Sequence, residues 1–132
     1  MKNVNPHFLH TLLAPLVGLA DDDDAVAAYA SLQPNCEQGV RHVIREVIVP
    51  HSLTLSSRAI EKIKLAYRFY LSTPGQKWDR VFDSVLLPFY APDDVRSFFV
   101  WVWEECFPGE SYNLPDLESY IVNPDINEPL TV

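Results

Sequence analysis

The sequence contains few of the residues that mark common catalytic and cofactor sites. Its 132 residues include only four glycines, and no glycine-rich phosphate loop is present. The two cysteines, Cys36 and Cys106, form no CxxC motif and could pair only if the fold brings them together. Because Cys106 falls on an apolar helical stripe, we expect a buried free thiol, which suits a reducing cytoplasm.

Positive charge is scarce in the second half of the chain. Residues 67–132 carry four basic and eleven acidic side chains, a net charge of 4 − 11 = −7, whereas residues 1–66 carry six and seven. No lysine or arginine follows Arg96. An acidic surface repels nucleic acid and anionic membranes and attracts basic proteins. The alternative is that the acidity only aids solubility.

Long apolar runs are also missing. No stretch approaches the roughly 20 apolar residues that cross a bilayer, so we expect no membrane partner and a cytoplasmic protein. Lys2 followed by residues 8–20 loosely imitates a signal peptide. His10 and Pro15 interrupt its apolar core, so a short helix is the favoured interpretation and a signal sequence the alternative.

The hydrophobic pattern that is present is mainly helical. Apolar residues recur at three- and four-residue intervals in five segments: 8–16, 40–48, 60–71, 78–86 and 95–106. A short helix over 114–121 is a weaker prediction, and residues 113–132 are expected to be partly irregular. The sequence therefore predicts an all-α fold, a compact single-domain bundle of about five to seven helices spanning residues 1–132.

Local signals predict where several helices begin and end. Pro50 is expected to end the 40–48 helix, for which a β-branched strand at 47–49 is the alternative. Thr54 or Ser56 is expected to cap the next helix. The four aspartates at 21–24 are expected to form a cap and a solvated turn, because they lack the spaced ligands and the glycine of a calcium loop. Asp93 or Asp94 is expected to cap the last long helix.

The segment 78–110 holds all three tryptophans and is rich in carboxylates. Trp103 belongs to the apolar stripe of the last long helix, whereas Trp101 falls on the opposite side beside Glu104 and Glu105. One interpretation is that Trp101 is a binding anchor surrounded by acids. The other is that this helix is buried on two sides.

No arrangement in the sequence predicts catalysis. Acid–base chemistry needs carboxylates or histidines held together in one cleft, and Asp79 and Asp83, one helical turn apart, are more typical of a solvated face. His7 and His10 have a spacing that allows metal binding, but no third ligand is evident. We expect no enzyme activity, no metal and no cofactor. An unrecognised hydrolase with a site assembled from scattered residues stays the alternative.

One part of the chain resembles a known class of proteins. The runs WDRVFDSVLLPF (78–89) and PDDVRSFFVWVWEECF (92–107) resemble small helical bacterial immunity proteins encoded beside contact-dependent growth inhibition and related polymorphic toxins. The resemblance covers roughly residues 54–110. It implies a cytoplasmic protein that binds the toxin domain of its neighbour and blocks it. Such families share no active site, so no functional residues carry over.

The acidity of the second half agrees with a basic, nuclease-type toxin as the partner, since opposite charges speed association. The candidate interface combines the carboxylates of the 78–110 segment with one aromatic anchor: Asp79, Asp83, Asp93, Asp94, Trp101, Glu104, Glu105 and Glu110. The alternative function is a helical adaptor or small-ligand module, in which Trp101 would line an apolar pocket.

Overall fold

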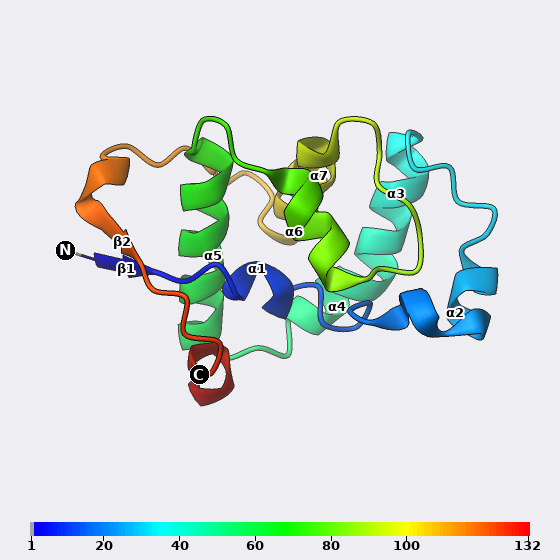
Figure 1. Cartoon of the computed structure of the whole chain (residues 1–132), viewed down its shortest axis with the longest axis horizontal. Helices are drawn as coiled ribbons and strands as arrows, with labels where there is room; N and C mark the ends of the chain where they lie inside the picture. The colour runs from blue at the N-terminus through cyan, green and yellow to red at the C-terminus, as the bar shows by residue number, and fades with distance from the viewer. Residues whose placement is uncertain (1) are drawn as a thin grey trace.

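The structure is a computed structural model that describes residues 2–132. Helices dominate it, and a short sheet lies at one end of the long axis with α2 at the other (Figure 1). The elements in chain order are β1 (Lys2–Val4), α1 (Phe8–Thr11), η1 (Leu19–Asp21), α2 (Asp23–Ala28), α3 (Glu37–Val43), η2 (Ile44–Ile48), α4 (Val49–Ser52), α5 (Ser57–Ser72), α6 (Trp78–Val85), α7 (Val95–Cys106), η3 (Leu117–Ser119), β2 (Tyr120–Val122) and η4 (Glu128–Thr131).

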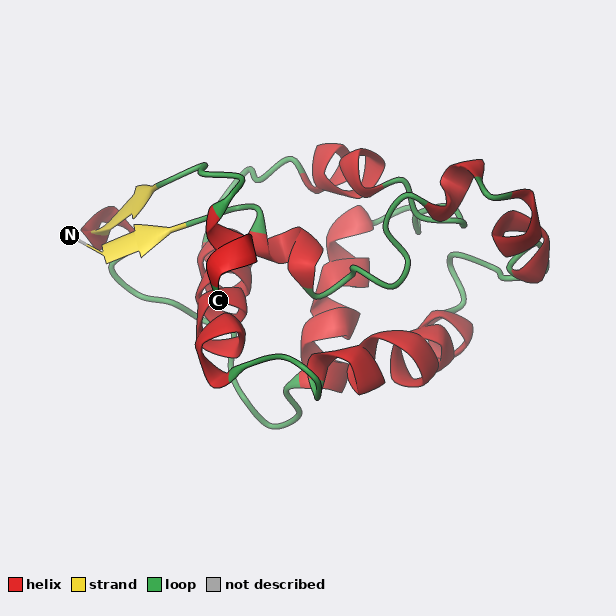
Figure 2. Cartoon of the chain, turned by 90° about the horizontal axis from the view of Figure 1, so that it is seen from below, coloured by secondary structure: helices red, strands yellow, loops and turns green. Residues whose placement is uncertain are grey.

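The mostly helical prediction is confirmed, but the purely all-α class is wrong. β1 and β2 form a two-stranded parallel sheet in which Lys2 lies opposite Tyr120 and Val4 opposite Val122 (Figure 2). The predicted helix over 114–121 is replaced by the turn η3 and by β2. Strands of three residues are too short to produce a periodic signal, and their pairing partner lies at the other end of the chain.

The C-terminal tail is held against the N-terminal segment by one buried side chain. Asn5 is 4% exposed, and its Nδ2 donates to the Asp125 carbonyl at 2.7 Å and to Glu128 Oε1 at 2.9 Å. Asn5 Oδ1 accepts a hydrogen bond from the His7 backbone N–H at 2.9 Å. A buried amide costs stability unless it is satisfied in this way. Asn5 thus begins a turn, and α1 starts three residues later at Phe8.

α7 is the centre of the core. It contacts α3, η2, α4, α5 and α6. Phe98, Phe99, Val102 and Trp103, all predicted on one stripe or next to it, are at most 1% exposed. The Phe99 ring packs 4.5 Å from that of Trp78 on α6, centroid to centroid. Aromatic pairs at such distances add to the free energy of burial, so this contact stabilises the packing of α6 on α7.

The N-terminal segment also contributes to this core. Its apolar residues, predicted to form one helical face, are all at most 1% exposed: Phe8, Leu9, Leu12, Leu13 and Leu16. Only Phe8–Thr11 is α-helical, and turns follow as far as η1.

Among residues 2–132, no helix combines the length and the apolar character that a membrane span requires.

Pro50 does not end its helix, which corrects the prediction. α3, η2 and α4 follow one another without a break, and η2 is a π-helical stretch in which the Val49 N–H donates to the Ile44 carbonyl. A proline ring clashes with the carbonyl four residues earlier and offers no N–H. The wider π-turn just before Pro50 removes part of that conflict, so the helix continues. The strand alternative at 47–49 is also wrong.

The predicted caps have mixed outcomes. Ser56 caps α5 by accepting from the Ala59 N–H at 3.1 Å, and Asp22 caps α2 by accepting from Asp24 N–H at 3.0 Å. Asp94 occupies the N-cap position of α7, and its backbone carbonyl accepts the Ser97 N–H at 3.0 Å, but its side chain accepts no backbone N–H. Its carboxylate instead accepts from the Ser97 hydroxyl at 3.1 Å.

Candidate functional site

A hollow of about 330 Å³ opens between the end of α6, the loop after it and the chain around α2. Its lining is mostly apolar, and Asp83 is the only charged residue that contributes to it. The lining residues are Ala20, Val26, Phe82, Asp83, Leu86, Leu87, Pro88, Phe89, Tyr90 and Ala91.

The wall of this hollow is built by the way in which α6 ends. The last carbonyls of a helix have no partner within the helix. Here the N–H groups of Gly18 and Ala20 donate to the carbonyls of Val85 and Leu86, each at 2.9 Å. Gly18 has φ +80°, a conformation open to glycine at little cost. The segment before α2 is thereby fixed beside α6.

Leu86 is held in a strained conformation and is half-exposed. Its φ of 52° and ψ of 53° lie in the left-handed region, which costs a residue with a side chain about 1 kcal/mol. Leu86 is 50% exposed and Tyr90 is 86% exposed. Neither burial nor backbone preference accounts for these two apolar side chains at the hollow. Backbone strain such as that of Leu86 concentrates at binding sites.

Two of the predicted acids lie on α6 at or near the hollow. Asp79 and Asp83 are exposed, and neither forms an ion pair with any residue in 2–132. Asp93 and Asp94 follow the loop and are also exposed and outside the ion pairs of the described chain. The Asp93 backbone N–H donates to Asn35 Oδ1 at 2.7 Å, which fixes the loop against the segment before α3.

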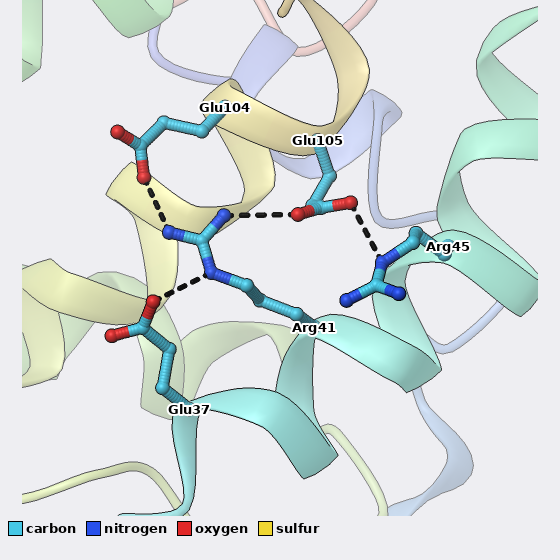
Figure 3. A network of polar contacts seen from close by, with 5 residues as sticks. All are labelled: Glu37, Arg41, Arg45, Glu104 and Glu105. Carbon is cyan, nitrogen blue, oxygen red and sulfur yellow. Dashed lines mark hydrogen bonds and ion pairs between the residues drawn. The ribbon is translucent and has the colours of Figure 1, made fainter.

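Two other predicted acids are occupied within the protein, in a network centred on Arg41 (Figure 3). The Arg41 guanidinium contacts Glu104 at 2.6 Å, Glu105 at 2.9 Å and Glu37 at 2.8 Å, and Arg45 contacts Glu105 at 2.9 Å. Burial alone would lower the pKa of Arg41, but the hydrogen bonds that its guanidinium donates to three carboxylates raise that pKa well above the usual arginine value. The network joins the α3–η2 helix to the end of α7. Glu104 and Glu105 therefore stabilise the packing of these two helical segments.

Glu110 is occupied in the same manner. Lys64 Nζ lies 2.9 Å from both Glu110 carboxylate oxygens, and Arg68 lies 3.4 Å from one of them. The Glu110 backbone carbonyl accepts a hydrogen bond from Trp103 Nε1 at 2.8 Å. Glu110 thus links the C-terminal end of α7 to α5. Because its carboxylate is paired, it adds less to the exposed negative charge than the sequence implies.

Trp101 is half-buried and packs against the core. α7 is covered on both sides, by α3 and η2 as well as by α5 and α6. This agrees with the interpretation in which the helix is buried on two sides. Trp101 does not line the hollow.

Sequence reasoning missed the partners of these acids and two side chains of the hollow. Arg41, Arg45 and Lys64 come from the first half of the chain, and their pairing with the acidic second half carries no local signal. Tyr90 lies between Pro88 and Pro92, a spacing that does predict a loop. A left-handed Leu86 leaves no trace in the sequence, because that conformation is normally occupied by glycine or asparagine.

Neither cysteine forms a disulfide; Cys36 is exposed and Cys106 half-buried. Burial raises the pKa of the Cys106 thiol to about 12, opposed by a hydrogen bond with Ser52 and assisted by the charge of Glu105. Only a thiolate is a strong nucleophile, so we expect Cys106 to react slowly at neutral pH. Within residues 2–132, no group of three or more His, Cys, Asp and Glu side chains is arranged to hold a metal ion.

We expect alkylation to separate the two thiols. Native protein treated with iodoacetamide at about pH 8 should gain one adduct, on Cys36, because the Cys106 thiol stays protonated and shielded. Protein in concentrated urea should gain two. Mass spectrometry of the intact chain and its peptides measures both numbers, and rapid native labelling of Cys106 would contradict the structure.

Comparison with protein-family models, with curated proteins and with solved structures gives no match to this chain.

The Arg41 network provides a stability prediction. Replacing Arg41 with alanine leaves the mostly buried Glu105 carboxylate with Arg45 alone and Glu104 without a partner. The expected loss is about 2 kcal/mol, between the values for exposed and buried pairs. Urea denaturation measures it. Arg58→Ala, an exposed arginine of α5 outside the ion pairs of residues 2–132, should change stability by less than about 0.5 kcal/mol; equal losses would mean the network adds nothing.

Proposed function

We propose that this protein is an immunity protein that binds a cognate, basic toxin domain and blocks it by stoichiometric association. The binding surface is the α6 face, defined here as Asp79, Asp83, Leu86 and Tyr90 together with the hollow beside them. The observation that carries the proposal is this pairing of an open apolar hollow with exposed apolar side chains and unpaired carboxylates.

The apolar part of the α6 face has the features of an interface centre. Protein interfaces are enriched in tyrosine, and a few large side chains near the centre carry most of the binding energy. Tyr90 is 86% exposed and Leu86 50% exposed, beside an apolar depression of about 330 Å³. A partner side chain inserted into the hollow would cover all three features at once.

The charge of the α6 face favours a cationic partner. Of the eleven acids in residues 67–132, four are paired with basic residues from α3, η2 or α5: Glu104, Glu105, Glu110 and Glu128. The remaining 11 − 4 = 7 include Asp79 and Asp83 on the α6 face and Asp93 and Asp94 after it. Unpaired carboxylates at an interface rim mainly raise the association rate of a basic partner.

A growth experiment tests the proposal. The gene beside the one for this protein should encode a protein that ends in a small basic domain, and expression of that domain should stop growth. Co-expression of this chain should restore growth, and the two proteins should copurify as a complex. Toxicity that is unchanged by this chain would refute the proposal, as would a neighbourhood without such a gene.

A small-ligand module is the second candidate, because the hollow lies at the lower end of the roughly 300–1,000 Å³ typical of ligand pockets. In that case an apolar fluorescent dye should bind at the hollow, and Phe82→Ala should reduce its affinity. If the protein is instead an immunity protein, the toxin domain should displace the dye from the hollow. Binding of a dye without any effect of the toxin domain would favour the second candidate.

Leu86 provides a prediction that separates binding from stability. Replacing Leu86 with glycine removes backbone strain of about 1 kcal/mol at little cost in packing, so the free energy of unfolding should stay within about 1 kcal/mol of the native value. Affinity for the toxin domain should fall about tenfold, because an exposed apolar contact is lost. Calorimetry measures both. A stable variant with native affinity would remove Leu86 from the interface.

A further inference from the structure

A second hollow lies between the segment that enters α1 and the outer side of α6. It measures about 200 Å³, and Pro6, Leu9 and Val81 form its apolar part. This volume is below the range of about 300–1,000 Å³ in which drug-sized ligands bind. It suits a small ion or the end of one side chain.

The polar lining of this second hollow is basic or neutral. His7, His10 and Arg80 contribute to it with Ser84 and Gln76, and no carboxylate does. Arg80 is exposed and forms no ion pair within residues 2–132. The whole chain has a net charge of −8, whereas this hollow is lined by an unpaired arginine, by two histidines and by no acidic residue. Guanidinium groups and protonated imidazoles are donors only, so the matching ligand is an acceptor.

The positions of the two histidines agree with this chemistry. Their ring centroids are 5.8 Å apart and the rings are nearly perpendicular. His10 Nε2 lies 3.4 Å from Ser84 Oγ, and that hydroxyl donates its proton to the Val81 carbonyl at 2.8 Å. When Ser84 donates its proton to Val81, it can only accept from His10, and this arrangement requires a proton on His10 Nε2 and leaves Nδ1 for a further partner.

The surroundings of His10 disfavour its charged form. Burial, and then the neighbouring His7, lower the pKa of His10. The charged and titratable groups that line this hollow are His7 and Arg80; Asp79 and Asp83, also on α6, do not line it. A bound anion would oppose the effects of burial and of His7 on the pKa of His10, and would therefore favour protonation of His10. By linkage, anion binding should take up protons and weaken as the pH rises through the range in which histidine titrates.

We infer that this second hollow is a binding site for a small oxyanion of the phosphate class, held by Arg80 together with ring N–H groups of His7 and His10. The ligand is either free phosphate or a phosphate monoester, which share the same recognition chemistry. This inference is independent of the toxin-binding proposal, because it involves an anionic ligand instead of a cationic partner and residues outside the α6 face.

Titration of the full chain with inorganic phosphate and, separately, with phenyl phosphate tests the inference. At about pH 6, saturable binding should shift the NMR signals of His7 and His10 but not those of His42 and His51. Affinity should fall about tenfold by about pH 8. Tighter binding of inorganic phosphate would identify the free ion as ligand, and tighter binding of phenyl phosphate a monoester.

Two variants complete the test. Arg80→Gln should weaken phosphate binding at least about tenfold, whereas Arg58→Gln, an exposed arginine on α5, should not. His10→Gln should weaken binding and remove its pH dependence. Arg80 is exposed and His10 is half-buried, and circular dichroism checks that the fold is kept. The inference is overturned by equal affinities of the two arginine variants, by uniform shifts of all four histidines, or by no saturation up to about 20 mM phosphate at about pH 6.

Discussion

Replacing Tyr90 with alanine should weaken binding of the toxin domain about 30-fold or more, equivalent to about 2 kcal/mol or more. Tyr90 is 86% exposed in the free protein, so its ring is available for burial by a partner. An exposed tyrosine contributes little to folding, and the free energy of unfolding should change by less than about 0.5 kcal/mol. Calorimetric titration and urea denaturation measure the two quantities.

The matched control for Tyr90 is Leu130→Ala. Leu130 is 82% exposed and belongs to η4, near the C-terminus and away from the α6 face (Figure 1). Its replacement should leave both stability and toxin binding unchanged. If Leu130→Ala weakens binding and Tyr90→Ala does not, the partner docks on the terminal region and the α6 face is not the interface.

Replacing Trp103 with alanine should destabilise the protein by about 4 kcal/mol, a large part of the 5–15 kcal/mol typical of a domain. Trp103 is 1% exposed, packs 4.8 Å from the Phe107 ring, and donates its Nε1–H to the Glu110 carbonyl. The substitution leaves both a cavity and an unsatisfied carbonyl. Urea denaturation followed by circular dichroism measures the loss.

Trp101 is the control in the same helix. Because Trp101 is only half-buried, Trp101→Ala should cost about 1–2 kcal/mol, clearly less than Trp103→Ala. Its effect on toxin binding should be small. If Trp101→Ala instead abolishes binding at little cost in stability, Trp101 is the anchor and the interface lies on its side of α7.

The helices could be predicted because their signals are local. The stripes of α5, α6 and α7 repeat every three to four residues, and the caps at Asp22 and Ser56 are formed with neighbours in the chain. Each of these features is decided within one or two helical turns. Local signals also misled at Pro50, where a π-turn lets the helix continue, since the cost of the proline is offset by packing around η2.

The parallel sheet could not be predicted, because it depends on two segments about as far apart as the chain permits. Val4 and Val122 are each part of a three-residue strand, and such strands are stable only when paired and anchored. The amide of Asn5 provides part of that anchor through Asp125 and Glu128. Nothing in the sequence around Asn5 distinguishes this role from a helix cap.

The candidate site could be predicted only in part, because it also depends on contacts between distant segments of the chain. The sequence gives the number and sign of the charges but not their partners, and Glu104, Glu105 and Glu110 are paired across the fold. Asp79 and Asp83 are the predicted acids that lie on the α6 face. The apolar features beside them, which include a left-handed Leu86, arise from the end of a helix meeting a distant loop.

Amide hydrogen exchange of the complex with the toxin domain locates the binding surface most directly. The α6 face should become protected, which means slower exchange in residues 83–91 and in residues 20–26 around the hollow. Exchange in residues 120–131, at the other end of the molecule, should stay as in the free protein. Protection confined to the C-terminal residues, or to α3 and the end of α7 where the Arg41 network lies, would contradict the assignment of the α6 face as the docking surface.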